Sequence, residues 1–560
     1  MSLYPAILVL LKEIAKMESL HPLMQEYKKQ MERGAVANAY RGLMDYLMAL
    51  RTHLQKKHPD FILSYSLYQG YMDMTYFAFT SAAISSAFLD RSVRTAIRQG
   101  AIMKIRLWFC VVFFLFCACT PAAKVRKTKG NTTFIATAAD LKARIPSQLT
   151  ITKPDFVVFV PECTDERVND TGNEHFLVFD GPDGSLMAVW TQSSAESQPD
   201  QHMAFSRSDD EGRTWSKPRI IAGPKKPGEG HMASWGYPLV SKSGRIYVLY
   251  SQSIGRVDTF PHSTGWLHGI YSDDNGVTWS APQNVPLRRS IYDNPDSTMP
   301  PNILCWQKPL RNAKEGRYFA GVTRWTSFSR YQNPTDSWMS ADARVEFMRF
   351  ENIDEDPEPR EIQISWFAFN EQSLAVGYPG HPEISACQEP SIVKLPDGRL
   401  FCVMRTAAGS PYWSISADAG ETWSQPRPLL RKDGGRPLLH PLSPCPIYDM
   451  GGNEAGSGHY VLFIHNHDGH YMGYKPTDSS YHRRPVFMVR GVFQPGADQP
   501  VWFDEPEFFF DHNGVSLGKP GTDGRLDLAL YASFTVRNGV PVLWYPDRKF
   551  FLLGRIIQHP

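Results

Sequence analysis

The sequence lacks several features that would point directly to a function. Positive and negative charges are nearly balanced, because 59 Lys and Arg stand against 57 Asp and Glu, for a net charge of +2. A nucleic-acid-binding surface is therefore not expected. The eight cysteines show no metal-ligand spacing, and buried free thiols are their simplest interpretation. We accordingly expect neither a metal nor another cofactor.

Turn residues and tryptophan, in contrast, are plentiful. The 560 residues include 41 Gly, 43 Pro and 14 Trp, which is typical of a turn-rich all-β protein. A chain of this length is too long for one compact core and predicts two or more units.

An octapeptide of the form S-x-D-x-G-x-T-W occurs three times. Its copies read SDDEGRTW at residues 208–215, SDDNGVTW at 272–279 and SADAGETW at 416–423. The Asp of each copy can accept hydrogen bonds from backbone N–H groups of a turn, and the Gly supplies a positive φ. The Trp provides a large apolar side chain beneath that turn. Such a repeated unit predicts a repeat architecture.

The octapeptide resembles the Asp-box, or BNR repeat, of the sialidase superfamily. The resemblance implies an all-β fold over residues 151–560, a six-bladed β-propeller in which the boxes are structural and lie away from the active site. Alternating strands around an Asp-Gly or Ser-Gly turn at residues 177–190, 237–250 and 391–404 predict inner hairpins of the blades. The box aspartates lie 64 and then 144 residues apart, so one blade between the second and third box lacks a clean copy.

A different unit precedes the predicted propeller. Residues 1–102 show helical periodicity and resemble a small uncharacterised bacterial domain family. Residues 103–119 have a basic start, an apolar core and a small residue before Cys119, as a lipoprotein signal does. The apolar core is shorter than the roughly 20 residues of a membrane-spanning helix, and the alternative is a buried core helix. Residues 120–150 then read as a polar tether.

Such a signal works at an N-terminus, yet 102 residues precede it. We therefore expect Met103 to begin the secreted protein, with the upstream residues reflecting a wrong start or a fused neighbouring gene. The protein would then be a periplasmic or outer-membrane lipoprotein, held at the membrane by a lipid on Cys119.

The resemblance also implies a chemistry. Sialidases hold a carboxylated sugar with three Arg, attack its anomeric carbon with a Tyr that a Glu activates, and use a separate Asp as acid/base. A neutral phenol can approach a carbon that bears a carboxylate, where a second carboxylate would be repelled. With an ordinary pKa near 10, the phenol needs an adjacent base at neutral pH. The Tyr is an exception to the usual pair of carboxylates in glycosidases.

Two stretches match the nucleophile and its base. Residues 388–405 resemble the family's Glu strand and the Arg strand after it, which implies Glu389 as the activating base and Arg405 as a substrate ligand. Residues 530–545 resemble the nucleophile strand and its hairpin partner, which implies Tyr531 as the nucleophile.

Two further positions match the pattern more loosely. Arg483 and Arg484 stand where the family places another Arg, and the sequence leaves the choice between them open. Asp200 stands on the way to the first box, where the resemblance implies the acid/base Asp. The alternative for each of these residues is a purely structural role, in a surface ion pair or an ordinary turn.

The sequence departs from the family in its first blade. The family has an Arg there, but residues 172–177 read GNEHFL, so Asn173, Glu174 or His175 takes its place. Losing one of three charge-assisted contacts weakens carboxylate binding, and a Glu would repel the carboxylate. A related acidic sugar, or an uncharged one, becomes an alternative to sialic acid.

Three functional hypotheses follow. The first is an exo-α-sialidase-like glycoside hydrolase that removes a terminal, sialic-acid-like sugar from a glycan and acts as a monomer. The second is a hydrolase or lyase on a uronate- or rhamnose-containing glycan that uses His175 or a neighbour as acid or base. The third is a glycan-binding propeller without catalysis. The fold alone does not choose among them.

Overall fold

The structure, a computed structural model, describes the C-terminal part of the chain. Its described residues are 138–163, 170–226, 228–312, 315–335, 337–452, 455–469, 473, 477, 483–518, 526–529 and 531–558. The predicted helix-rich domain, the signal segment with Cys119 and most of the predicted tether lie outside them. The described part begins with helix α7 (Ala138–Leu149), so the end of the stretch predicted as a tether is helical. No helix among the described residues is long and apolar enough to cross a membrane.

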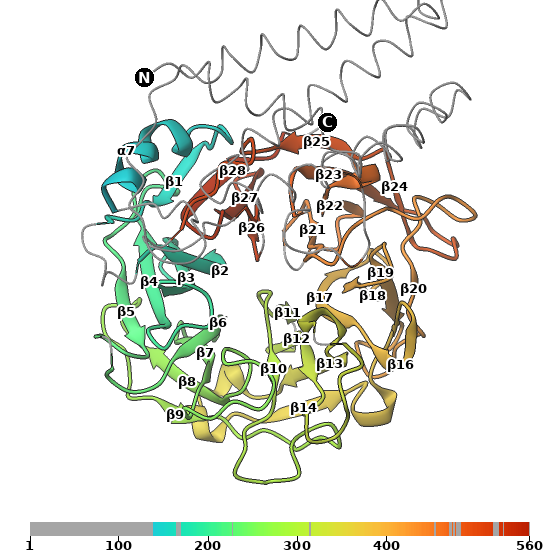
Figure 1. Ribbon diagram of the computed structural model, residues 1–560, viewed down its shortest axis with the longest axis horizontal. Helices are drawn as coiled ribbons and strands as arrows, with labels where there is room; N and C mark the ends of the chain where they lie inside the picture. Colours follow the sequence, from blue (N-terminus) through green and yellow to red (C-terminus); the bar gives the residue numbers. More distant parts are fainter. Residues whose placement is uncertain are drawn as a thin grey trace, which may run out of the picture. The chain divides into compact units, whose positions relative to one another are not determined.

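Six antiparallel sheets follow one another around a central axis (Figure 1). Blade one consists of β2 (Gly172–Asp180), β3 (Leu186–Ser193), β4 (His202–Ser208) and β5 (Arg219–Ala222). Blade two consists of β6 (Ala233–Val240), β7 (Ile246–Gln252), β8 (Trp266–Ser272) and β9 (Gln283–Asn284). Blade three consists of β10 (Ile303–Leu304), β11 (Leu310–Asn312), β12 (Arg317–Trp325), β13 (Ala343–Phe350) and β14 (Ile364–Phe367).

The second half of the propeller has the same plan. Blade four consists of β17 (Cys387–Lys394), β18 (Leu400–Thr406), β19 (Tyr412–Ser416) and β20 (Arg427–Pro428). Blade five consists of β21 (Ile447–Asp449), β22 (His459–His465), β23 (Val486–Phe493), β24 (Val501–Phe503) and β25 (Glu507–Phe510). Blade six consists of β26 (Ser533–Arg537), β27 (Val540–Asp547), β28 (Phe551–Ile556) and β1 (Phe156–Phe159).

The connections contain short 3₁₀ helices and one small hairpin. These elements are η2 (Trp338–Ser340), η3 (Ile353–Glu355), η4 (Pro359–Glu361), η5 (Asn370–Gln372), η6 (His467–Gly469), β15 (Gly377–Tyr378) and β16 (His381–Ser385). The predicted six-bladed propeller is confirmed. The predicted inner hairpins are β2–β3, β6–β7 and β17–β18, and blade three is the blade without a clean box.

The ring is closed by strands from the two ends of the described chain. Strand β1 pairs antiparallel with β28, where Phe156 lies opposite Gly554 and Val157 opposite Leu553. Beside this seam, the Thr152 hydroxyl lies 2.8 Å from the Tyr545 hydroxyl. Radial closure of this kind leaves only short sheet edges exposed.

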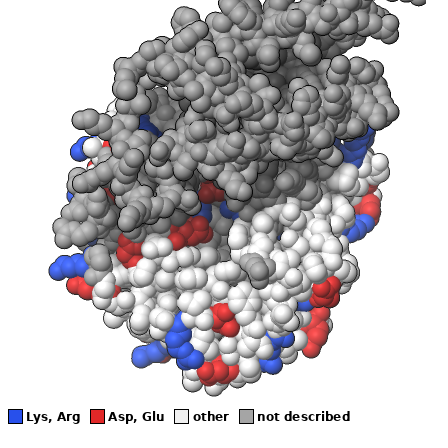
Figure 2. Space-filling view, viewed as in Figure 1, with Lys and Arg blue, Asp and Glu red and all other residues white. Residues whose placement is uncertain are grey.

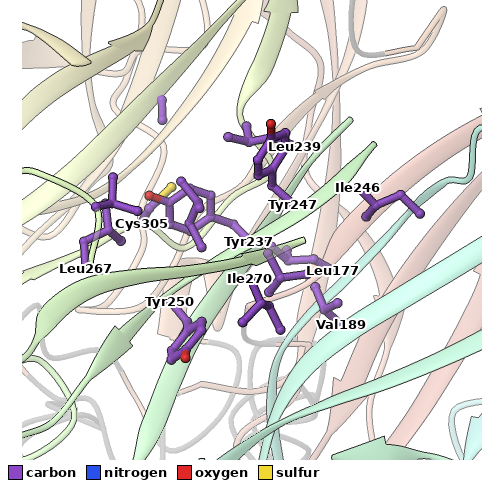
Figure 3. Close-up of a cluster of buried hydrophobic side chains, with 14 of the residues drawn as sticks. Leu177, Val189, Tyr237, Leu239, Ile246, Tyr247, Tyr250, Leu267, Ile270 and Cys305 are labelled. Carbon is purple, nitrogen blue, oxygen red and sulfur yellow. The ribbon is translucent and has the colours of Figure 1, made fainter. Parts of the chain in front are cut away.

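Blades pack face to face, so their strands are covered on both sides. Strand β3 is buried along its whole length. One large cluster joins blades one, two and three, and Figure 3 shows part of it, with Leu177 and Val189 from blade one beside Tyr237 and Tyr250 from blade two. Truncating such a fully buried aliphatic side chain costs about 2–5 kcal/mol. On the face seen in Figure 2, charged side chains of both signs are scattered over the described residues, in keeping with the balanced composition.

The three octapeptides form the turns from the third to the fourth strand of blades one, two and four. In the second copy, Asp274 accepts hydrogen bonds from the Thr278 backbone N–H at 2.8 Å and from the Thr278 hydroxyl at 2.5 Å. The Ser272 hydroxyl accepts from the Gly276 N–H at 2.8 Å. The other two copies show the same bonds at the same distances.

Each box turn also rests on the preceding blade. A Cβ added to Gly276 would clash with the Phe205 ring of blade one, and the centroid of the Trp279 ring lies 5.4 Å from that of the same ring. In the first copy Trp215 packs on Trp544 of blade six, and in the third Trp423 stacks on Phe347 of blade three. The predicted structural role of the boxes is thus to join neighbouring blades at the rim.

The five described cysteines are free and buried, as expected from their spacing. They are Cys163, Cys305, Cys387, Cys402 and Cys445. Burial raises the pKa of each thiol, so all five are neutral at physiological pH.

Candidate active site

A backbone bulge recurs in the innermost strands. The pairing of β2, β6 and β17 with the next strand is interrupted by a register shift at the same point of each blade. The bulges hold His175, Trp235 and Glu389 in the left-handed region, with φ of 53°, 57° and 49°. Tyr531, just before β26, has a φ of 59°. Strained non-glycine residues of this kind cluster at functional sites.

Side chains from these four left-handed positions meet near the axis. The Tyr531 ring stands edge-on to Trp235 at 4.8 Å, and the His175 ring lies 4.8 Å from Trp235. The Tyr531 hydroxyl donates a hydrogen bond to Glu389 Oε1 at 3.0 Å. Blades one, two, four and six therefore contribute one side chain each to a single cluster.

Arg405 completes the contact between Tyr531 and Glu389. It lies on β18 opposite Gln388, and its Nη1 is 2.6 Å from Glu389 Oε1. The Glu389 backbone N–H donates to the Thr323 hydroxyl at 2.6 Å, which fixes the bulge against blade three. Among the described residues, Glu389 Oε2 and Arg405 Nε have no hydrogen-bond partner although both are buried. Both atoms therefore keep hydrogen-bonding capacity that the described residues leave unused.

The electrostatics keep the phenol neutral in the resting site. Burial, and then the charge of Glu389, raise the pKa of Tyr531 well above its ordinary value, while Arg405 and Arg483 oppose the shift. The hydroxyl is therefore protonated at neutral pH. A phenol needs an acceptor for its proton to act as a nucleophile at neutral pH, and Glu389 is the carboxylate hydrogen-bonded to this one.

The structure distinguishes the two candidate arginines of blade five. Trp338 in η2 lies over both Arg405 and Arg483, at 5.5 and 5.7 Å from the ring centroid. Arg483 also donates to the Leu442 carbonyl. Arg484 instead forms an ion pair with Asp511. Arg483 is thus the one that joins the cluster around Arg405.

The first blade supplies a carboxylate where the family has an Arg. Glu174 is buried and lies 2.7 Å from Lys549 Nζ, which comes from the turn between β27 and β28. Asn173 is used structurally, because its amide donates to the Phe550 carbonyl at 2.9 Å. Burial lowers the pKa of His175 to about 3, so this imidazole is neutral. The positive charge beside the first blade is therefore that of Lys549, which belongs to blade six.

Asp200 lies in the loop between β3 and β4. Its two carboxylate oxygens accept hydrogen bonds from the backbone N–H and the hydroxyl of Ser194, at 3.0 and 3.1 Å. Among the described residues, no hydrogen bond or ion pair joins Asp200 to Tyr531 or Glu389. Its assignment as acid/base stays a prediction.

A cavity lies farther along the inner strands. Lys308, Pro390, Tyr448 and Phe534 are among the side chains that line it, and Lys308 Nζ donates to the Phe534 carbonyl at 2.6 Å. The described residues that line it do not include the Tyr531–Glu389 pair. The part of the chain that the structure describes also contains no group of three or more His, Cys, Asp or Glu that could hold a metal ion.

Several site residues could not be identified from the sequence. Trp235 had a usable signal, because it stands two residues before an inner hairpin, as His175 and Glu389 do. Lys549 and Trp338 had none, because their contacts come from distant parts of the chain.

Comparison with known proteins identifies the family. Residues 184–467, half of the chain, match the BNR repeat-like domain. The chain therefore belongs to the BNR repeat-like domain family, which confirms the resemblance carried by the octapeptides. Residues 20–91 match a domain of unknown function, DUF7000. A search of curated proteins found no match.

Solved structures with a similar fold include sialidases. The NanB sialidase from Streptococcus pneumoniae is 12% identical, with a TM-score of 0.46, over 72% of this chain and 70% of that one. The intramolecular trans-sialidase from Ruminococcus gnavus is 12% identical, with a TM-score of 0.44, over 72% and 97%. A protein of unknown function from Dyadobacter fermentans is 12% identical, with a TM-score of 0.44, over 72% and 96%.

Proposed function

We propose that the propeller is an exo-glycosidase of the sialidase type, which removes a terminal, sialic-acid-like sugar from a glycan. The observation that carries this proposal is the buried group of Tyr531, Glu389 and Arg405 at the axis, with the phenol hydrogen-bonded to the carboxylate. A tyrosine paired with a glutamate is the arrangement that nucleophilic attack by a phenol needs.

In the proposed reaction, Tyr531 attacks the anomeric carbon as Glu389 takes the phenolic proton. The bond to the leaving oxygen breaks, and that oxygen is protonated by an acid. Water then releases the sugar from Tyr531, which recovers its proton from Glu389. Arg405 and Arg483 orient the sugar, and the unpartnered Nε of Arg405 provides a donor for it.

The test is release of 4-methylumbelliferone from its α-linked N-acetylneuraminic acid glycoside. Tyr531→Phe should lower turnover at least about 10³-fold, because the nucleophile is removed. Tyr250→Phe is the matched control, since Tyr250 is a buried tyrosine of blade two whose hydroxyl has no hydrogen-bond partner among the described residues. This control should retain wild-type turnover.

Other outcomes would favour the other hypotheses. A rise in ultraviolet absorbance on a uronate-containing glycan would indicate a lyase. Glycan binding without turnover would indicate a binding propeller. Turnover that survives in Tyr531→Phe would contradict the proposed nucleophile.

Export and anchoring form a separate proposal. We propose that Met103 starts an exported chain, that Cys119 carries a lipid, and that the protein is a monomeric periplasmic or outer-membrane lipoprotein. Labelled palmitate should enter the wild-type protein and not Cys119→Ala. A mature product that retains residues 1–102, seen by intact mass, would contradict it.

A further inference from the structure

The loop between β3 and β4 carries a second carboxylate close to Tyr531. Glu196 has 32% of its side chain exposed, against 3% for Glu174 and for Glu389. Its Oε2 lies 2.6 Å from Lys549 Nζ, and that nitrogen lies 5.3 Å from the centroid of the Tyr531 ring. Glu196 is near enough to Tyr531 for its charge to raise the pKa of the phenol. It is therefore the acidic group of this cluster that solvent and a substrate can reach.

The loop is held in place from three blades. Within it, Asp200 binds the backbone N–H and the hydroxyl of Ser194, which closes the loop at its base. The Ser197 hydroxyl lies 2.6 Å from His262 Nδ1, on a loop of blade two. Lys549 reaches Glu196 from blade six. The loop that carries Glu196 is thus held on several sides, and Lys549 orients its carboxylate.

Lys549 is itself rigidly placed. Its side chain is 2% exposed, and both it and Arg548 adopt left-handed backbone conformations, with φ of 50° and 59°. Its carbonyl accepts a hydrogen bond from the Asn173 N–H at 2.7 Å. Non-glycine residues remain in such conformations where the surrounding structure imposes them.

Two carboxylates meet at Lys549. Glu174 and Glu196 share this one ammonium, which lies 2.7 and 2.6 Å from their oxygens. Two carboxylates at close range in a low dielectric resist ionising together. Glu174 also accepts a hydrogen bond from Gln201 Nε2 at 3.2 Å, which stabilises its ionised form. Of the two carboxylates, Glu196 is the one that water and a substrate can reach to exchange a proton.

The approach directions also fit proton transfer. Glu389 belongs to blade four, and Glu196 extends from blade one, which lies across the ring from it (Figure 1). A sugar that is attacked by Tyr531 would have the base of the nucleophile on one side and Glu196 on the other. In a double displacement the nucleophile and the acid/base group flank the scissile bond, which fits Tyr531 and Glu196 in this arrangement.

We propose that Glu196 is the catalytic acid and base of the site and that Asp200 is a positioning residue for its loop. The inference rests on the glycosidase function proposed above. In the first step Tyr531 Oη bonds to the anomeric carbon, its proton passes to Glu389, and the departing oxygen takes the proton of Glu196. In the second step Glu196 takes a proton from water, the water oxygen bonds to the anomeric carbon, and Tyr531 leaves and regains its proton from Glu389.

The test compares two substrates that differ in their leaving group. Glu196→Gln should lower kcat/KM for 3′-sialyllactose about 10²–10⁴-fold, because a sugar hydroxyl leaves poorly without a proton. The same variant should lose far less on the 4-methylumbelliferyl glycoside, whose phenolic leaving group needs little protonation. Sodium azide needs no base to attack the anomeric carbon, because it has no proton to lose. It should therefore raise the turnover of the aryl glycoside by Glu196→Gln and form a glycosyl azide.

Two variants serve as controls. Asp200→Asn should lower kcat/KM for both substrates by similar factors, smaller than the loss in Glu196→Gln on 3′-sialyllactose. It disturbs the loop without removing the proton donor. Glu211→Gln, a matched change in the first box turn at the rim, should leave both rates unchanged. Thermal midpoints of all three variants show whether the fold is intact.

The outcomes separate this inference from the proposed function. If the wild-type protein turns over both substrates and Glu196→Gln loses the same factor on both, or stays within about threefold of wild type on both, Glu196 is not the proton donor. If the wild-type protein cleaves neither substrate and forms no Tyr531 adduct with 2,3-difluorosialic acid by intact mass, the proposed function fails and this inference fails with it.

Discussion

At the rim of the propeller, three turns share both sequence and geometry. In each, an Asp carboxylate accepts from the backbone N–H of a Thr at 2.8 Å and from its hydroxyl at 2.5 Å. At the axis, four blades share a left-handed backbone position, but it holds His175, Trp235, Glu389 and Tyr531. The rim repeats residues together with their conformation, whereas the axis repeats the conformation and varies the residue.

The difference has a physical basis. The Ser, Asp and Thr hydrogen bonds that recur in every box turn lie within eight residues, so this shared geometry is encoded locally. A bulge sets only the direction of its side chain. The partners of that side chain come from other blades, and each blade can therefore contribute a different group to one site.

The largest expected effect comes from changing a bulge residue. Glu389→Gln should lower turnover of the aryl sialoside about 10²–10⁴-fold, because Tyr531 loses its base. It should also lower the free energy of unfolding by about 3 kcal/mol, because the buried Arg405 loses the charge that offsets it. Initial rates and urea unfolding measure the two effects.

The matched rim variant is Glu421→Gln, an exposed position in the third box turn. It should alter neither quantity. Wild-type turnover in Glu389→Gln would contradict the expectation that the axis residues carry the chemistry while the rim turns do not.

A change at a box glycine should affect stability without affecting chemistry. Gly276→Ala should destabilise the fold by about 2–4 kcal/mol, because the alanine would have to adopt a positive φ and its Cβ would clash with the Phe205 ring. Urea unfolding measures the loss, and kcat of the folded protein should stay unchanged.

Gly398→Ala separates the backbone strain of a positive φ from the contact between blades. Gly398 has a φ of 88° in the β17–β18 turn, and its added Cβ would meet nothing within 4 Å. We expect a loss of about 1–2 kcal/mol there. Equal losses in the two variants would show that the contact between blades contributes nothing.

The smallest expected effect is the acid sensitivity of a box. Hydrogen bonds from the Thr278 hydroxyl and backbone lower the pKa of Asp274 to about 2. A lowered pKa stabilises the fold above the ordinary carboxyl pKa of about 3.9, and this stabilisation is lost as pH falls from there toward 2. Asp274→Asn should therefore flatten the dependence of stability on pH between about 4 and 2.

Asp273→Asn in the same turn is the control. It leaves the bonds between Asp274 and Thr278 in place, so the dependence below pH 4 should persist. Urea unfolding at several pH values measures both variants. An unchanged slope in Asp274→Asn would show that the box carboxylate is no more stabilised in the fold than in the unfolded chain.

Much of the fold could be predicted because its signals are local. The octapeptides and the inner hairpins, such as residues 391–404, each lie within one stretch of chain, and the architecture follows from their number and spacing. Within the site, Glu389, Arg405 and Tyr531 were accessible through their resemblance to known strands. The structure joins them by direct contacts.

Other parts of the site depend on contacts between remote residues. The choice of Arg483 over Arg484 rests on Trp338, because both Arg483 and Arg405 lie against its ring. Trp338 lies about 145 residues before Arg483 in the chain. The pairing of Glu174 with Lys549 joins blade one to blade six. No local pattern marks either contact.

The sequence by itself determined the rim turns and the inner hairpins, because short-range turn chemistry and strand periodicity suffice for these. Its resemblance to the sialidase superfamily implied the six blades and a tyrosine, a glutamate and an arginine as candidates. The tertiary structure decided where the charges meet. Ring closure brings Lys549 onto Glu174 and Glu196, although more than 350 residues separate it from them. Charge and burial act through space rather than along the chain, so these properties of the site arise only when the blades close into a ring.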